Sequence, residues 1–243
     1  GESAVIAHVV GYLAAARYRC CVASMEYRVA LWMMRMNRLI SGTEQPTEQF
    51  SRWVTQQLKG NLIAFDVTGK AKAARILEVF RYARRRYGVE LFVIDNLTKC
   101  GFSDDDYSGQ KQFVEELTDF ARAEQTHVAI VAHMRKTESE DKPCGKFGVK
   151  GSGGITDMAD TVIEVWRNKP KERAKQQAER DKTPLDVKYA DAADTLLICH
   201  KQRATGVEPA VRLYYDPRTT QFLGKAHHSA RPLVTTEKFV RAA

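Results

Sequence analysis

The feature that most constrains the fold of this chain is a set of continuous apolar runs that alternate with helical patterns. In such a run consecutive residues are apolar, as in "LFVID" at residues 91–95. Side chains of a strand point alternately to its two faces, so a strand of this kind must be covered on both faces. The pattern therefore predicts an α/β fold with a mostly parallel sheet between two layers of helices.

The spacing of apolar residues predicts the order of the elements. We expect helical segments at residues 3–17, 27–42, 46–58, 72–88, 107–125 and 154–160. We expect strands at residues 19–25, 61–67, 91–96, 127–134, 161–168 and 193–203, and a C-terminal β-hairpin within 211–224. The charged insertion at 169–184 is either a solvated helix or a mobile segment. Residues 1–224 are predicted to form one domain, followed by a tail at 225–243.

Composition limits the partners and the compartment. The 243 residues carry 38 Lys plus Arg against 30 Asp plus Glu, and the net charge of +8 favours an anionic partner such as nucleic acid or nucleotide. The five Cys form no Cys-x-x-Cys pair, which argues against a zinc site and for a reducing compartment. No apolar run reaches about 18 residues, and no signal peptide is evident. We expect a cytoplasmic protein of a bacterium or phage-infected cell, without a membrane partner.

Polar residues follow four of the predicted strands at their carboxyl ends. They are Glu26, Asp95, His133, and the pair Lys201 and Arg203. Because the carboxyl ends of parallel strands share one edge of a sheet, we expect these side chains to lie along one rim. Each residue alone has an ordinary explanation as a strand end or a surface charge. Their joint occurrence favours a site for nucleotide hydrolysis.

Nucleotide hydrolysis assigns a role to each of these residues. Asp95 would hold Mg²⁺, which neutralises charge on the phosphates of ATP. Glu26 would orient or deprotonate the attacking water, and His133 would contact the γ-phosphate. Lys201 and Arg203 would add positive charge to the transition state.

Five stretches of the chain together resemble the DnaB-like replicative helicases. They are "CVASMEYRVALWMMRM", "LFVIDNL", "VAIVAHMRK", "KGSGGITDMADTVIEVWRN" and "LLICHKQRATG". The version here is most similar to the branch of phage helicase-primases and mitochondrial Twinkle, which carries His where bacterial DnaB proteins usually carry Gln, as at His133. The resemblance implies a RecA-like P-loop NTPase core in a ring of six subunits. ATP would bind between subunits and single-stranded DNA would pass through the centre.

The resemblance also implies roles for residues that composition and spacing do not single out. Lys201 and Arg203 would act in the neighbouring subunit's site. Arg167 and Tyr215 would sandwich the nucleotide base, although a strand-end charge and a hairpin aromatic would be ordinary. The loop "KFGVKGSGGITD" would contact DNA through Lys146, Lys150, Gly151, Ser152 and Gly153.

The phosphate-binding motif departs from the family pattern. The pattern Gly-x-x-x-x-Gly-Lys-Ser follows a strand, whereas this chain begins with Gly1-Glu2-Ser3, and the first strand is missing. Gly1 and Ser3 match nucleotide-binding positions, and Ser3 would join Asp95 at the metal. Glu2 stands where Lys belongs and would repel a triphosphate. The chain is either a fragment cut inside the motif or a degenerate relative.

Several expectations follow from the incomplete motif. The chain should bind ATP weakly or not at all, and on its own it should be a monomer or a weak oligomer. The sheet should contain a gap, or a segment such as 231–240 should fill the missing position. The function predicted for the parent is that of an ATP-dependent replicative helicase motor domain. The alternatives are a RecA- or KaiC-like ATPase that does not unwind DNA, and a pseudo-ATPase that only binds its partners.

Overall fold

The computed structural model describes residues 1–66, 72–103, 106–133, 141–145, 148 and 153–234. Its helices are α1 (Glu2–Ala15), α2 (Val29–Ser41), α3 (Glu48–Leu58), α4 (Ala73–Tyr87), α5 (Tyr107–Ala123), α6 (Gly153–Met158), α7 (Lys169–Asp181) and α8 (Val187–Ala190), with a short 3₁₀ turn at Leu97–Lys99. Its strands are β1 (Cys20–Ser24), β2 (Leu62–Ala64), β3 (Leu91–Asp95), β4 (His127–Val131), β5 (Thr161–Arg167), β6 (Thr195–Gln202), β7 (Ala210–Asp216) and β8 (Gln221–Leu223).

The first sheet is parallel and has the order β2-β1-β3-β4. Its register pairs Ser24 with Asp95, and Asp95 with Val131, so β1, β3 and β4 end at the same level. The segments that carry Glu26, Asp95 and His133 therefore leave the sheet side by side, as the sequence predicted.

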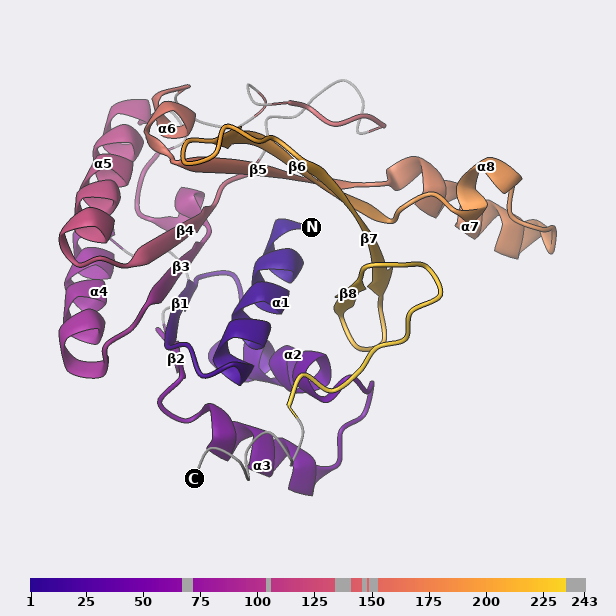
Figure 1. Ribbon diagram of the computed structural model, residues 1–243, viewed down its shortest axis with the longest axis horizontal. Helices are drawn as coiled ribbons and strands as arrows, with labels where there is room; N and C mark the ends of the chain where they lie inside the picture. Colours follow the sequence, from indigo (N-terminus) through magenta and orange to yellow (C-terminus); the bar gives the residue numbers. More distant parts are fainter. Residues whose placement is uncertain (67–71, 104–105, 134–140, 146–147, 149–152, 235–243) are drawn as a thin grey trace.

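Both faces of the parallel sheet are covered by helices (Figure 1). Alternate residues of β1 and β3, such as Cys21 and Phe92, pack in one cluster with side chains of α4 and α5. The intervening residues, such as Val22 and Val93, pack in a second cluster with α1, α2 and α3. This arrangement explains why β1 and β3 are apolar at nearly every position, and it confirms the predicted α/β layers.

The second sheet is antiparallel and has the order β5-β6-β7-β8. In Figure 1 it arches away from β4 and over α1, and α7 and α8 project from its far side. The prediction that β6 ends on the same rim as Asp95 is therefore wrong. An apolar run identifies a buried strand, but it carries no information on the direction in which that strand runs.

The expected gap is present between the two sheets. Among the described strands, β4 pairs only with β3, and four of its five residues are more exposed than the fully buried residues of β3. The segment 231–240 was one candidate to fill the gap. Its described part lies elsewhere, because the Leu233 N–H donates to the Ile40 carbonyl at the end of α2. Residues 235–240 lie outside the described part of the chain.

The described part of the expected tail is packed against the domain. Val234 is buried in the cluster of α1, α2 and α3. The charged insertion forms α7, which begins after Asn168; the Asn168 side chain accepts a hydrogen bond from the Lys171 N–H. In the parts of the chain that the structure describes, no helix combines the length and the apolar character that a membrane span requires.

Candidate active site

Asp95 and Ser3 meet at the carboxyl edge of the parallel sheet. The Ser3 hydroxyl, in the first turn of α1, donates to Asp95 Oδ1 over 2.9 Å. Asp95 is only 3% exposed. Burial raises the pKa of the Asp95 carboxyl above its ordinary value, with the Ser3 hydrogen bond opposing the shift and the nearby Glu26 carboxylate adding to it. A buried carboxylate beside a hydroxyl is a pair of hard oxygen donors that suits Mg²⁺.

Glu26 and His133 are brought together by a residue that the sequence analysis did not single out. Asn96 Nδ2 donates to Glu26 Oε1 over 2.5 Å and lies 2.8 Å from His133 Nε2. His133 Nε2 is itself 3.5 Å from Glu26 Oε1. Asn96 is fully buried, and its own Oδ1 accepts from the Thr98 hydroxyl. The amide therefore fixes the Glu26 carboxylate and the His133 ring at one point.

Asn96 follows Asp95 directly, across a cis peptide bond. The nearby backbone of β1 is held as well, because the Met25 N–H donates to the Asp95 carbonyl over 2.9 Å. The signal that could have revealed Asn96 is its position next to a strand-end carboxylate. In a sequence, however, an Asn at that place is typical of an ordinary turn.

Lys201 and Arg203 do not join this cluster. Lys201 Nζ donates to the carbonyls of Thr156 and Asp157 at the end of α6, over 3.0 and 2.7 Å. Arg203 donates to the Asp157 carbonyl and to Asp160 Oδ1, over 3.1 and 2.6 Å. Both cations thus hold the last carbonyls of α6, which have no partner within the helix.

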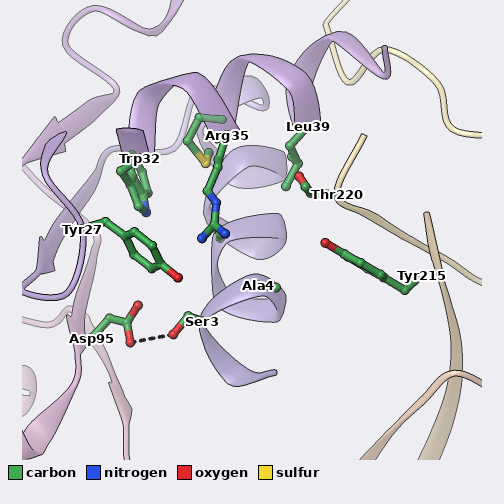
Figure 2. A pocket seen from close by; sticks show the side chains of 11 residues that line it. Ser3, Ala4, Tyr27, Trp32, Arg35, Leu39, Asp95, Tyr215 and Thr220 are labelled. Carbon is green, nitrogen blue, oxygen red and sulfur yellow. Dashed lines mark hydrogen bonds between the residues drawn. The ribbon is translucent and has the colours of Figure 1, made fainter. Parts of the chain in front are cut away.

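A pocket extends from Ser3 and Asp95 towards the hairpin of β7 and β8 (Figure 2). Its open volume is about 480 Å³. The lining residues come from α1, the start of β1's following loop, α2, β3 and the hairpin: Ser3, Ala4, Ala7, Tyr27, Trp32, Arg35, Met36, Leu39, Asp95, Tyr215 and Thr220. One end is therefore polar and lies at the carboxyl edge of the sheet, while the other end is mainly apolar and aromatic.

The far end of the pocket contains two tyrosines and an arginine. Figure 2 shows the Arg35 guanidinium between the rings of Tyr27 and Tyr215. The Arg35 guanidinium carbon lies 4.4 Å from the centre of the Tyr27 ring. Burial raises the pKa of the Tyr215 hydroxyl, and the positive charges of Arg35 and Arg167 oppose the shift. Aromatic faces and a guanidinium plane are the groups on which a nucleotide base stacks.

Sequence reasoning predicted Tyr215 here but missed Tyr27 and Arg35. Both missed residues lie at or near α2, where an arginine on a helix reads as an ordinary surface charge. The predicted partner of Tyr215, Arg167, is not among the residues that line the pocket in the described structure. Its guanidinium forms an ion pair with Glu172.

The remaining predicted positions fall at the edges of what the structure describes. Gly1 precedes α1 as its N-cap, and Glu2 occupies the first turn. Gly153 begins α6. Lys146, Lys150, Gly151 and Ser152 lie outside the described residues.

The acidic loop after β3 has a partly structural explanation. Asp106 caps α5, because its Oδ1 accepts the Gly109 N–H over 2.8 Å. A carboxylate at this position also interacts favourably with the helix dipole. Asp104 and Asp105 lie outside the described residues.

Comparison with known families gives one match over most of the chain. A family model described as "DnaB-like helicase C terminal domain" matches residues 16–224. Among curated proteins, the DNA helicase/primase of Enterobacteria phage T3 is 22% identical over 112 residues. That match covers 43% of this chain and 20% of the relative, so it spans about a fifth of that protein.

Comparison with solved structures agrees on the fold. A helicase ATPase domain matches with a TM-score of 0.70 and 16% identity, covering 92% of this chain and 80% of that chain. A structure described as a DnaB-like replicative helicase with its interactions with primase matches with a TM-score of 0.61 and 16% identity. This second match covers 88% of this chain and 56% of the other. The RecA-like fold predicted from the sequence is thus confirmed.

Proposed function

Because the chain belongs to the DnaB-like helicase C-terminal domain family, we propose that it is the motor domain of a replicative DNA helicase that hydrolyses ATP. The parent protein would couple hydrolysis to movement along single-stranded DNA. The observation that carries this proposal is the Ser3–Asp95 pair, 2.9 Å apart, at the sheet edge where Glu26, Asn96 and His133 also meet.

Ser3 and Asp95 would hold Mg²⁺. When bound, the ion would supply positive charge that neutralises the phosphate oxygens of ATP. The phosphates would lie at the N-terminus of α1, where backbone N–H groups point outward and favour an anion. In this chain the Glu2 carboxylate stands in the same turn and opposes that attraction.

Glu26 would accept the proton of the attacking water. Asn96 restrains the Glu26 carboxylate through a hydrogen bond, and His133 lies within reach of both. A general base acts efficiently when it is already oriented, because the cost of ordering it has been met in folding. His133 would contact the terminal phosphate and change partners when that phosphate leaves.

The aromatic end of the pocket would hold the base. Tyr27 and Arg35 already stack on one another, and Tyr215 faces them across the pocket. We assign these three residues, with Arg167 at the margin, to base binding. Stacking is tolerant of base identity, so this end favours nucleotides in general over a single base.

The assembly is proposed on the family pattern. Lys201 and Arg203 would reach the nucleotide of a neighbouring subunit in a ring of six, in the cytoplasm of a bacterium or phage-infected cell. Single-stranded DNA would contact Lys146, Lys150, Gly151, Ser152 and Gly153. The net charge of +8 supports a nucleic-acid partner.

The direct test is ATP hydrolysis by the chain with Glu2→Lys, with and without single-stranded DNA. We expect Mg²⁺-dependent hydrolysis that DNA stimulates and that Glu26→Gln reduces at least a hundredfold. Unwinding of a forked duplex by the full-length parent separates a helicase from a RecA- or KaiC-like ATPase. Hydrolysis stimulated by DNA without strand separation would favour the latter.

A second function is favoured by Glu2 itself. If Glu is the natural residue at this position, the domain would be a pseudo-ATPase that uses the scaffold to hold nucleic acid. In that case the chain would bind single-stranded DNA, and neither the parent protein nor its Glu2→Lys variant would hydrolyse ATP.

A further inference from the structure

A buried carboxylate outside the candidate active site has three hydrogen-bond partners. Glu164, on β5, accepts the backbone N–H of Cys144 over 2.7 Å and that of Gly145 over 3.1 Å. His200 Nε2, on the paired strand β6, lies 2.7 Å from the second carboxylate oxygen. The Glu164 side chain is 4% exposed and that of His200 is 18% exposed.

This arrangement has a cost that the sheet does not require. Burying a carboxylate is unfavourable unless it is fully hydrogen-bonded, and an apolar residue on β5 would avoid the cost. The three partners of Glu164 offset that cost. Two of them are successive backbone N–H groups, and Gly145 has a φ of +76°, a geometry in which the backbone forms a concave anion site. The charge therefore holds a particular backbone conformation at Cys144 and Gly145.

The held backbone lies where the proposed DNA-binding segment, residues 146–153, begins. The same segment ends at α6, whose last carbonyls accept hydrogen bonds from Lys201 and Arg203. His200 and Lys201 are neighbours on β6. Both ends of the segment are thus tied to the end of one strand, the upstream end through Glu164 and His200 and the downstream end through the two cations.

We propose that Glu164 is a positioning residue for DNA binding, which with His200 fixes the start of the DNA-binding segment relative to Lys201 and Arg203. This inference rests on the proposed function, which assigns DNA to residues 146–153. It has one mechanical consequence. Lys201 cannot hold the α6 carbonyls and a neighbouring subunit's phosphate at once, so nucleotide would loosen the downstream end while Glu164 keeps the upstream end in place.

Glu164→Ala tests the anchor and its role separately. Hydrogen exchange at the Cys144 and Gly145 amides reports the anchor and needs no DNA. We expect exchange at both amides to rise at least tenfold. Fluorescence anisotropy with a labelled oligothymidylate reports DNA binding, and we expect the Kd to rise about tenfold. Glu164→Gln should lie between, because its single amide oxygen can still accept one of the two N–H groups.

Glu90→Ala is the matched control. Glu90 also accepts a backbone N–H, that of Arg19 over 3.1 Å, but it lies at the opposite edge of the parallel sheet. It should change neither measurement. Unchanged exchange at Cys144 and Gly145 in Glu164→Ala would overturn the inference, as would raised exchange with an unchanged Kd. Failure of the unsubstituted chain to bind DNA at all would instead contradict the proposed DNA-binding role of the domain, and with it the role of Glu164.

Discussion

Asp95 is the residue at which stability and proposed function conflict most directly. Its carboxyl is buried, and burial raises its pKa, so the folded chain favours the neutral form. Metal binding needs the ionised form. Because the folded-state pKa lies above the unfolded value, ionisation of Asp95 costs stability as pH rises through the folded-state pKa. Below an ordinary aspartate pKa of about 3.9 the cost vanishes.

Asp95→Asn should therefore stabilise the metal-free chain at pH 7. The Asn oxygen can still accept from Ser3, while the buried charge is gone. Urea denaturation should give a higher unfolding free energy for the variant at pH 7, and the difference should shrink towards pH 4. Millimolar Mg²⁺ should raise the stability of the unsubstituted chain more than that of the variant.

Asp186→Asn is the control for this prediction. Asp186 is an exposed cap whose pKa is lowered by hydrogen bonds from the Lys188 N–H and side chain, so its shift has the opposite sign. This variant should not be stabilised at pH 7. Equal or lower stability of Asp95→Asn at pH 7 would mean that the Asp95 charge is not destabilising in the folded chain.

Glu2 is the residue on which ATP affinity is expected to depend. A carboxylate in the first turn of α1 stabilises the helix but repels phosphate at the same place. Glu2→Lys should raise the affinity for Mg-ATP at least tenfold in calorimetry, and Glu2→Gln should raise it by less, since it only removes repulsion. Submicromolar binding of ATP by the unsubstituted chain would contradict this account.

At the scale of elements, α2 joins the pocket to the C-terminal segment. The buried Gln221 side chain of β8 donates to the carbonyls of Leu39 and Arg231, over 2.6 and 2.7 Å. Gly42 ends α2 with a φ of +64°, and a Cβ placed there would lie 2.4 Å from the Arg231 backbone. Residues 231–234 therefore close over the end of the helix that carries Arg35.

Gly42→Ala should cost more than the same change at Gly88. Both glycines end a helix in the left-handed conformation, where an alanine costs about 1–2 kcal/mol. At Gly88 the added Cβ meets only the flexible Arg19 side chain, whereas at Gly42 it meets backbone. We expect about 1 kcal/mol for Gly88→Ala and about 2–4 kcal/mol for Gly42→Ala in urea denaturation.

A truncated chain isolates the contact. In a chain ending at Ala230, the costs of Gly42→Ala and Gly88→Ala should become similar, because the Arg231 backbone is gone. A cost of Gly42→Ala that stays high after truncation would show that residues 231–234 do not determine it.

Sequence patterns predicted what depends on local order and missed what depends on direction and distance. Glu26, Asp95 and His133 could be placed on one rim because parallel strands end together. The place of Lys201 could not be predicted, because "LLICHK" has the same apolar pattern in a parallel or an antiparallel strand. Asn96 and Arg35 were missed because their roles arise from contacts across the fold. Gln221 bonds a carbonyl 182 positions away in the sequence, which no local pattern reveals.

At the scale of the whole molecule, two sheets meet at an open edge. Among the described strands, β4 has a neighbour on one side only, and the antiparallel sheet begins beyond it. An unpaired edge of this kind accepts a further strand. The Lys201 and Arg203 side chains, meanwhile, hold α6 of their own subunit and contact no phosphate-binding group among the described residues. The chain thus offers the parts of a ring without the contacts that would assemble one alone.

Assembly should therefore depend on ligands. We expect light scattering to give a monomer or a weak oligomer for the chain alone, and larger species for the Glu2→Lys variant with Mg²⁺, a non-hydrolysable ATP analogue and single-stranded DNA. If Lys201 and Arg203 bind the neighbour's nucleotide, Arg203→Ala should reduce this ligand-dependent assembly while leaving the melting temperature of the isolated chain within about 2 °C, since an exposed ion pair contributes little to stability. A stable hexamer of the unsubstituted chain without nucleotide or DNA would show that other surfaces drive assembly.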